Sequence, residues 1–313
     1  MRPLTKTRAL RHGLPLLLCL SVLCAASAQA AKVYRWKDAN GTVRYGDQPP
    51  SGKASHGPVK VIPVEVQPGA IARLRIVRAE DGYQAWAENA LAGPVEVRLG
   101  FGRNRNTRGE PALPARATVA AGDSALVARI LGVNPAQSGD FELRMDAVPG
   151  KPGVRPRDVE YTFPLLTPDL RVEQGFGGAY SHNDEQNHYA VDFAAPIGTD
   201  VVAARDGLVM QVENDFGSAG LNREKYGERA NFVRILHDDD TMALYAHLAE
   251  GGVLVRQGQR VRSGQLIGRS GNTGFTSGPH LHFAVQANQG MRLVSVPFRM
   301  FSPQGILRFG ETR

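Results

Sequence analysis

Apolar and polar residues alternate along most of the chain, which is the pattern of half-buried β-strands. The alternation is clearest at residues 74–76, 95–99 and 141–145. Turn-forming pairs such as Asp81-Gly82 separate the runs. The period of an amphipathic helix is nearly absent. We therefore expect a mostly β, antiparallel fold.

The strand pattern divides the chain into three regions after residue 30. Residues 31–54 contain one aromatic hairpin, and its Asn40-Gly41 pair favours a two-residue turn. Residues 55–165 carry short alternating strands at the spacing of an immunoglobulin-like β-sandwich. Residues 166–313 read as strands again, broken by glycines that suit tight turns in a compact antiparallel sheet. We expect a β-hairpin module, a β-sandwich accessory domain and a second antiparallel β domain.

The first thirty residues have the order of a cleavable export signal. Four basic residues and no acidic residue precede an apolar run at positions 14–26, and the segment ends in Ala28-Gln29-Ala30. The run is shorter than the roughly 20 apolar residues that span a membrane, and no later segment approaches that length. Both cysteines lie within this segment. We therefore expect an exported, thiol-free mature chain, in the periplasm or secreted, with no transmembrane segment.

Composition and charge narrow the classes of function. The 313 residues are 42% hydrophobic and 21% charged, which excludes a disordered chain. The formal charge of +7 includes four basic residues of the export signal. The rest is uneven, with 19 basic and 14 acidic residues in positions 31–165 against 14 and 16 in positions 166–313. No stripe of Lys and Arg is interleaved with aromatic residues, so nucleic-acid binding is not indicated.

Histidines carry the candidate chemistry. Six of the eight lie in the C-terminal region: His182, His188, His237, His247, His280 and His282. His188 and Asp192 are four positions apart, a spacing that shares one face of a strand or of a helix. His280 and His282 are two apart, so both imidazoles would point to one face of a strand. His188, Asp192 and one of the latter pair would supply the three protein ligands of a catalytic zinc ion.

The remaining histidines are candidates for acid–base work near neutral pH. His247 stands two positions after Tyr245, so we expect them to share a strand face, with Tyr245 a weaker candidate for stabilising an oxyanion. Other hydrolase arrangements are excluded. The chain has no His-Glu-x-x-His motif and no Gly-x-Ser-x-Gly elbow, and the mature part has no cysteine nucleophile.

Residues 174–286 resemble the lysostaphin/LytM-type zinc endopeptidases of bacterial cell walls. The resemblance rests on residues 188–207, on Leu-Tyr-Ala-His-Leu at 244–248, and on residues 258–283 with their concluding Ser-Gly-Pro-His-Leu-His-Phe. It implies that the ligands of one Zn²⁺ are His188, Asp192 and His282. It also implies that His247 and His280 are the catalytic histidines that do not bind the metal.

The sequence departs from the family pattern in two places. Ala190 stands where glycine is usual, and Ala284 stands where an acidic residue is common. In relatives with a longer loop before the aspartate, an upstream Ser-His pair supplies the ligand. His182 in "AYSHNDEQNHYAVD" is therefore the alternative to His188.

The resemblance implies a zinc endopeptidase that cuts peptide crosslinks of peptidoglycan, either D-alanyl–diaminopimelate or glycyl–glycine bonds. Non-catalytic relatives that activate other hydrolases have lost ligands or catalytic histidines. All five positions are present here, which favours the enzyme and leaves the activator as the alternative. The hairpin resembles an uncharacterised module of proteobacterial envelope proteins, so an envelope partner is a candidate for the N-terminal regions. Residues 216–230 are expected either to flank the substrate groove or to form a solvated connection.

Overall fold

The computed structural model describes residues 32–37, 43–46, 60–63, 70–227, 229–303 and 305–310. Strands make up nearly all the regular structure, and the helical element in this part of the chain is one short turn, α1 (Arg223–Tyr226). The mostly β, antiparallel fold class is confirmed, with a parallel pairing of β11 (Glu160–Thr162) with β24 (Arg299–Ser302) as one exception. The predicted export signal lies outside the described residues.

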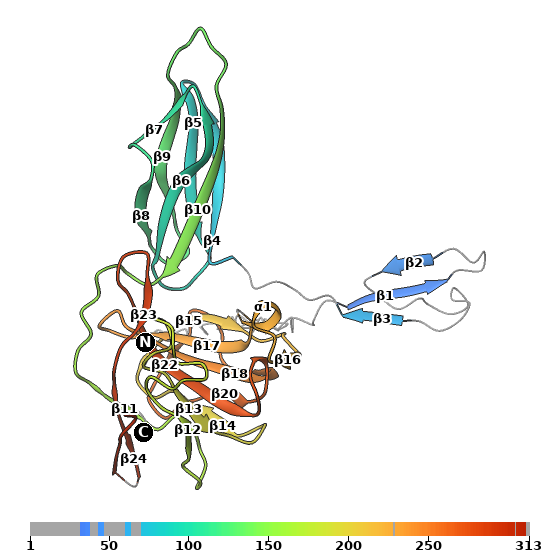
Figure 1. Ribbon diagram of the computed structural model, residues 1–313, viewed down its shortest axis with the longest axis vertical. Helices are drawn as coiled ribbons and strands as arrows, with labels where there is room; N and C mark the ends of the chain where they lie inside the picture. The colour runs from blue at the N-terminus through green and yellow to red at the C-terminus, as the bar shows by residue number, and fades with distance from the viewer. Residues whose placement is uncertain are drawn as a thin grey trace, which may run out of the picture.

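The predicted hairpin strands belong to a small sheet of three strands. β1 (Lys32–Lys37) pairs antiparallel with β2 (Val43–Gly46), and the turn between them lies outside the described residues. β3 (Lys60–Pro63) pairs with the other edge of β1. The strand pattern assigns residues 55–63 to the sandwich, whereas in the structure β3 pairs with the hairpin. Figure 1 draws the sheet apart from the other strands.

The sandwich consists of two antiparallel sheets with the strand orders β4-β5-β9-β7 and β10-β6-β8. The strands are β4 (Ala72–Ala79), β5 (Gly82–Asn89), β6 (Val95–Arg105), β7 (Thr107–Glu110), β8 (Ala115–Val119), β9 (Ser124–Gly132) and β10 (Asp140–Pro149). Alternation places Ala85 and Ala87 of one sheet against Val97 and Leu99 of the other in a shared core. Its assignment to the immunoglobulin type stays a prediction.

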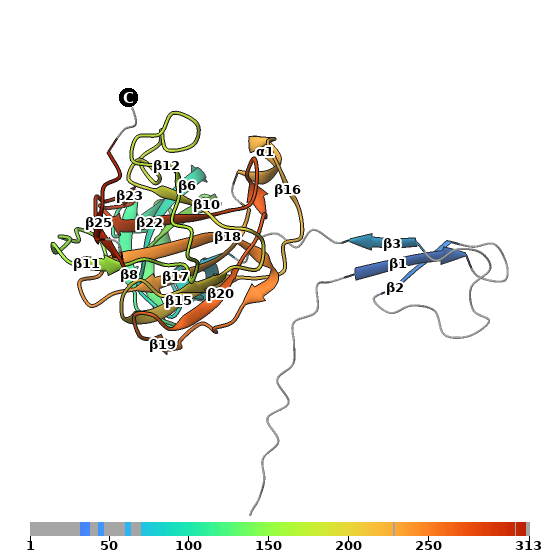
Figure 2. The same cartoon turned by 90° about the horizontal axis from the view of Figure 1, so that it is seen from below.

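The C-terminal region is built on a ten-stranded sheet with the central order β12-β13-β22-β18-β17-β15-β19 (Figures 1 and 2). Its strands are β12 (Val172–Gln174), β13 (Val191–Ala194), β14 (Asp200–Val202), β15 (Gly207–Glu213), β17 (Asn231–Leu236), β18 (Met242–Val253), β19 (Arg260–Val261), β20 (Leu266–Ser270), β22 (His280–Asn288) and β23 (Leu293–Ser295). Two smaller pieces flank it. β24 pairs with β25 (Gly305–Leu307), and β16 (Ala219–Gly220) pairs in parallel with β21 (Gly274–Phe275).

The central strand β22 is buried along its whole length, so each of its faces packs against other residues. One face joins the hydrophobic core, where Phe283 packs edge-to-face on Tyr245 and lies in one cluster with Phe193. The opposite face carries His280 and His282 toward a cavity. This division follows from strand geometry, because alternate side chains of one strand point to opposite faces.

The base of the sandwich packs directly on the C-terminal sheet. A side chain added at Gly93 would meet Met210, and one added at Gly150 would meet Met242, so both methionines lie against the sandwich backbone. The Ala92 amide also donates to the Met210 carbonyl at 3.1 Å. The methionines join the hydrophobic cluster of the sandwich, which therefore extends across the contact, while the C-terminal sheet keeps a core of its own.

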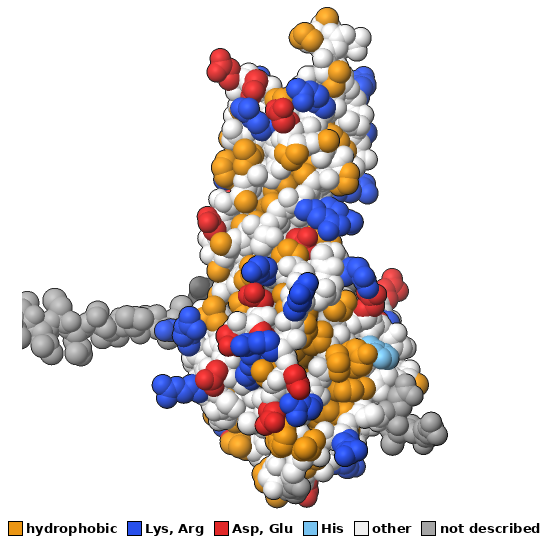
Figure 3. Space-filling view, turned by 90° about the vertical axis from the view of Figure 1, so that its left-hand side faces the viewer, with side chains coloured by type: hydrophobic (Ala, Val, Ile, Leu, Met, Phe, Trp, Pro, Cys, Tyr) orange, Lys and Arg blue, Asp and Glu red, His pale blue; other side chains and the backbone are white. Residues whose placement is uncertain are grey.

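The surface carries no large field of one sign on the face drawn in Figure 3, where Lys and Arg side chains are interspersed with Asp and Glu. Among the described residues, no helix has both the length and the apolar character needed to cross a membrane.

Candidate metal centre

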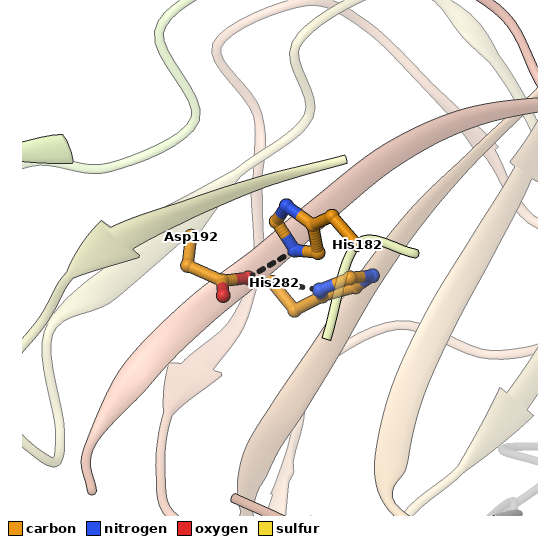
Figure 4. Close-up of side chains that lie close together, drawn as sticks. All are labelled: His182, Asp192 and His282. Atoms are coloured by element: carbon orange, nitrogen blue, oxygen red, sulfur yellow. Dashed lines mark hydrogen bonds and ion pairs between the residues drawn. The ribbon is translucent and has the colours of Figure 1, made fainter. Parts of the chain in front are cut away.

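Three side chains converge on one point between β13, β22 and the loop before β13. Asp192 on β13 stands directly opposite His282 on β22 in the antiparallel register. The Oδ1 atom of Asp192 lies 2.9 Å from Nδ1 of His282 and 3.2 Å from Nε2 of His182. One donor atom from each residue lies within 4.8 Å of the others. All three residues are buried, and Figure 4 shows the carboxylate pointing at both imidazoles.

The donor set fits a divalent metal of the zinc type. Two imidazole nitrogens and one carboxylate oxygen are the ligands of many catalytic zinc sites, which keep a further position open. Nδ1 of His182 lies 2.8 Å from the Gly175 carbonyl oxygen. The carbonyl can only accept, so Nδ1 carries a proton, and Nε2 is the atom that faces Asp192. Such a backbone contact is the usual way in which a metal-binding histidine is oriented.

Gln174 on β12 orients the aspartate. Its Nε2 donates to Oδ2 of Asp192 at 3.2 Å and to Oγ of Ser181 at 2.7 Å. Burial alone would raise the pKa of Asp192, but the hydrogen bonds from His182 and His282 outweigh it and hold that pKa well below its usual range. The carboxylate is therefore ionised and ready to bind a cation. Sequence analysis missed Gln174, because a lone glutamine carries no motif.

The structure does not bring His188 into this group. Asp192 lies on a strand that begins only at Val191, and His188 lies in the turn before it. Residues four apart share a face only when both lie on one strand or one helix, so the expected alignment does not occur. Its side chain is exposed, and its ring packs edge-on against Tyr189 at 4.6 Å between centroids. The alternative residue, His182, occupies the third corner of the group.

The two other expected histidines lie beside the cluster. Nε2 of His280 is 3.7 Å from Oδ1 of Asp192, and the His247 and His280 ring centroids are 4.7 Å apart. Nδ1 of His280 is 2.8 Å from the Gly278 carbonyl, and Nδ1 of His247 is 2.7 Å from the Thr273 carbonyl. These contacts place the ring protons on Nδ1, so each Nε2 of a neutral ring can accept a proton.

His247 reaches the site through a β-bulge. The pairing of β17 with β18 skips one residue here, since Asn231 pairs with Leu248 and Phe232 pairs with Ala246. His247 is the extra residue and has a φ of +63°. A bulge re-aims the side chain of the inserted residue, which is why it lines the cavity. Burial and the nearby His280 and His282 lower the pKa of His247 to about 3, so its ring is neutral near pH 7.

Tyr245 does not share the face of His247, so that expectation is wrong. Its side chain is fully buried, and its hydroxyl accepts a hydrogen bond from the Ala204 amide at 2.7 Å. The bulge at the following positions breaks the simple alternation on which the expectation relied. Tyr245 therefore supports the core beneath the site.

The cluster opens into a cavity of about 620 Å³. Arg223, Gly227, Arg229 and Ala230 line one side of it, as expected for a loop that flanks a groove. Tyr180 and Phe275 stack at 6.2 Å across its rim, and the Arg223 guanidinium lies 4.8 Å from the Phe275 ring centroid. The site thus combines a cluster that could hold a metal ion, two further histidines and room for an extended ligand.

Sequence comparison gives the class of protein to which this region is similar. Residues 186–293 match Peptidase family M23, so the C-terminal region contains an M23 peptidase domain of the lysostaphin/LytM type. The match includes Asp192, His247, His280 and His282, whereas His182 precedes it. Residues 20–72 match a domain of unknown function, DUF4124, which covers the small N-terminal sheet.

Individual relatives are similar over the peptidase region. The peptidoglycan DD-endopeptidase ShyA of Vibrio cholerae is 42% identical over 96 residues, 31% of this chain and 19% of that protein. The glycyl-glycine endopeptidase ALE-1 of Staphylococcus capitis is 38% identical over 102 residues, 33% of this chain and 25% of that protein. The solved catalytic domain of lysostaphin from Staphylococcus simulans is 32% identical, with a TM-score of 0.30 over 39% of this chain and 83% of that domain. The chain spans a fifth to a quarter of the length of the two curated relatives.

Proposed function

We propose that the protein is a zinc-dependent endopeptidase that hydrolyses peptide crosslinks of bacterial peptidoglycan. The observation that carries the proposal is the convergence of His182, Asp192 and His282 on one point, with His247 and His280 at its side. Relatives named as peptidoglycan DD-endopeptidase and glycyl-glycine endopeptidase support the substrate class.

The metal would be held by Nε2 of His182, a carboxylate oxygen of Asp192 and Nδ1 of His282. A zinc ion at this point supplies a Lewis acid that polarises a carbonyl group and lowers the pKa of water. We propose His182 as the ligand in place of His188, because its Nε2 already lies 3.2 Å from the Asp192 carboxylate.

The two remaining imidazoles would handle the protons. We propose that one of His280 and His247 accepts the proton of the attacking water at Nε2 and returns it to the leaving amine. The other, when it also carries a proton at Nε2, would donate a hydrogen bond to the oxyanion of the tetrahedral state, an interaction whose loss costs roughly 100- to 1,000-fold in turnover. The backbone carbonyls at Gly278 and Thr273 hold both rings in the required orientation.

We propose the D-alanyl–diaminopimelate crosslink as the first candidate bond, with the glycyl–glycine bond as the other. The DD-endopeptidase relative has the higher identity of the two named above, 42% against 38%. Export to the periplasm or beyond follows from the N-terminal signal pattern and from the location of peptidoglycan. The N-terminal sheet would be free to bind an envelope partner.

The test is digestion of intact sacculi by the purified, zinc-loaded mature protein, with released fragments identified by mass spectrometry. We expect new amino termini at one type of crosslink. The matched control is His247→Ala, which should retain zinc and lose turnover by about 100-fold or more. Binding to sacculi without any new amino terminus would contradict the enzyme and would favour an activator of other hydrolases.

A further inference from the structure

Arg234 lies on the floor of the catalytic cavity and has no carboxylate partner among the residues that the structure describes. It lies on β17 and borders both this cavity and a second one beside the sandwich. Its Nη1 donates to Oε1 of Gln211 at 3.2 Å, and its Nη2 donates to Oε1 of Gln286 at 3.3 Å. Its Nε is buried without any hydrogen-bond partner in the described part of the chain.

Two other arginines of the domain illustrate the more usual pairing with acids. Arg205 contacts Asp238 and Asp239, and Arg292 contacts Glu185. The hydrogen bonds from Arg234 are accepted by amide oxygens, which carry no net charge. Such bonds compensate only in part for the hydration that a guanidinium loses on burial. Burial lowers the pKa of Arg234 to about 10, so the group is still positively charged near pH 7. An incoming carboxylate would supply the missing negative charge.

The glutamines hold the guanidinium at a fixed place relative to the metal-binding cluster. Gln286 and His282 lie on the same face of β22, four residues apart, which corresponds to about 13 Å along a strand. Gln286 is itself fixed, because its Nε2 donates to the Gln186 carbonyl at 3.1 Å. Leu244, opposite Arg234 in the register, forms the apolar floor between the two points.

We propose that Arg234 forms a subsite that binds a carboxylate of the peptide substrate. This carboxylate would lie three to four residues along the peptide from the scissile bond. The inference rests on the proposed function, since it names a feature of that substrate. A guanidinium binds a carboxylate through two parallel hydrogen bonds, and an extended peptide advances about 3.3–3.6 Å per residue. Crosslinks built on diaminopimelate carry free carboxylates, whereas glycine bridges carry none along their length. Arg234 therefore selects acidic crosslinked peptides over glycine bridges.

The experiment uses two synthetic crosslinked peptides that differ only in carboxylate or carboxamide at the remote position. Cleavage by wild type, Arg234→Gln and Arg234→Lys is compared as kcat/KM. Wild type should prefer the carboxylate by about 10- to 100-fold, as expected for hydrogen bonds to a charged group. Arg234→Gln should lose that preference, because its kcat/KM should fall more on the carboxylate peptide than on the carboxamide peptide. Arg234→Lys keeps the charge without the paired geometry and should retain part of the preference.

The control variant is Arg256→Gln, which removes an exposed arginine outside the cavity and should leave the preference unchanged. If Arg234→Gln slows both peptides equally, Arg234 is a structural support for the two glutamines and the subsite is overturned. A wild type without preference overturns it as well.

A binding measurement distinguishes failure of the Arg234 subsite from failure of the proposed endopeptidase activity. The same two peptides are titrated onto the zinc-loaded full mature chain by calorimetry, with wild type and Arg234→Gln. If neither peptide is cleaved but the carboxylate peptide binds more tightly to wild type alone, the proposed reaction fails and the subsite stands. Equal binding of both peptides overturns the subsite whatever the cleavage result.

Discussion

At the residue scale, the site depends on which nitrogen of each imidazole is free. His182, His247 and His280 each place Nδ1 within hydrogen-bonding distance of a backbone carbonyl, so each keeps Nε2 for chemistry. His282 differs, because its Nδ1 is the atom that faces Asp192. The backbone therefore decides how each side chain can act, and residue type alone does not.

The first prediction distinguishes the two candidates for the remaining histidine ligand, His182 and His188. His182→Ala should lower zinc affinity by more than about 100-fold, because even a residue that only orients a ligand is worth 10- to 100-fold. His188→Ala should bind zinc as the wild type does, since the His188 side chain is exposed and its ring contacts Tyr189. Zinc content after competition with a chelator measures both. Loss of zinc in His188→Ala but not in His182→Ala would instead identify His188 as the ligand.

A second prediction concerns His237, which lies in the core away from the site. Its Nδ1 is 2.7 Å from the Asp206 carbonyl, its Nε2 has no partner among the described residues, and it packs edge-on against Tyr161. Burial lowers the pKa of His237 to about 4 and outweighs the hydrogen bond to the Asp206 carbonyl, which raises it; Arg205 lowers it further.

The pKa of His237 is therefore lower in the folded chain than the ordinary value of 6.5. Above pH 6.5 the ring is neutral in both states. As the pH falls toward 4 the unfolded chain binds the extra proton, so the free energy of unfolding decreases by up to about 3 kcal/mol. His237→Gln should lose less stability than wild type between pH 7 and pH 4.5 in urea titrations. An identical loss in both proteins would refute this.

At the element scale, strand β18 and its bulge connect the core to the chemistry. Tyr245 and Leu248 are fully buried, whereas His247 between them turns to the cavity with a positive φ. A non-glycine residue in this region of φ is strained by about 1–3 kcal/mol, and the surrounding packing has to hold it. Asn231 is part of that packing, because its side chain bonds the Phe216 backbone in both directions.

The third prediction tests the close crossing beside this bulge. A Cβ at Gly271 would lie 2.3 Å from the Ala249 amide nitrogen, so a side chain there must displace backbone next to His247. Gly271→Ala should lower the free energy of unfolding by about 1–3 kcal/mol and should reduce turnover. Gly278→Ala is the matched control for stability, because a Cβ there meets nothing within 4 Å. Equal unfolding midpoints in denaturant would count against a tight crossing.

At the scale of the whole molecule, the sandwich is docked without lining the catalytic cavity. The described residues that line this cavity all come from positions 173–286. Residues 147–149 of β10 border the neighbouring cavity instead, and Arg234 borders both. The sandwich thus stands beside the groove, where it can extend the surface that a long substrate contacts.

The fourth prediction addresses this docking. Glu96 of the sandwich is buried, and its Oε2 accepts a hydrogen bond from the Met291 amide at 2.6 Å. Glu96→Ala should leave that amide unpaired, cost about 1–3 kcal/mol, and speed hydrogen exchange at Met291. Glu88→Ala is the control, because Glu88 pairs with Arg75 on the exposed side of the sandwich. Unchanged exchange at Met291 would show that the contact does not hold the two regions together.

Much of the architecture can be predicted from the sequence, because alternation is a local property. The antiparallel β class is confirmed, and Asp192, His247, His280 and His282 lie together as their motifs predicted. The pair on β22 is the clearest case. Strand geometry alone directs residues two apart to one face.

Only the tertiary structure decided which loop residue completes the metal-binding group and which residues support it. His182 lies in one group with Asp192 and His282, whereas His188 does not, because the strand that carries Asp192 begins only at Val191. No local sequence pattern predicts the bulge at His247 or the contact of Gln174 with Asp192. The same is true of Arg234, which has no carboxylate partner among the described residues. Each depends on where distant strands and loops meet, and such long-range packing is set by the whole fold.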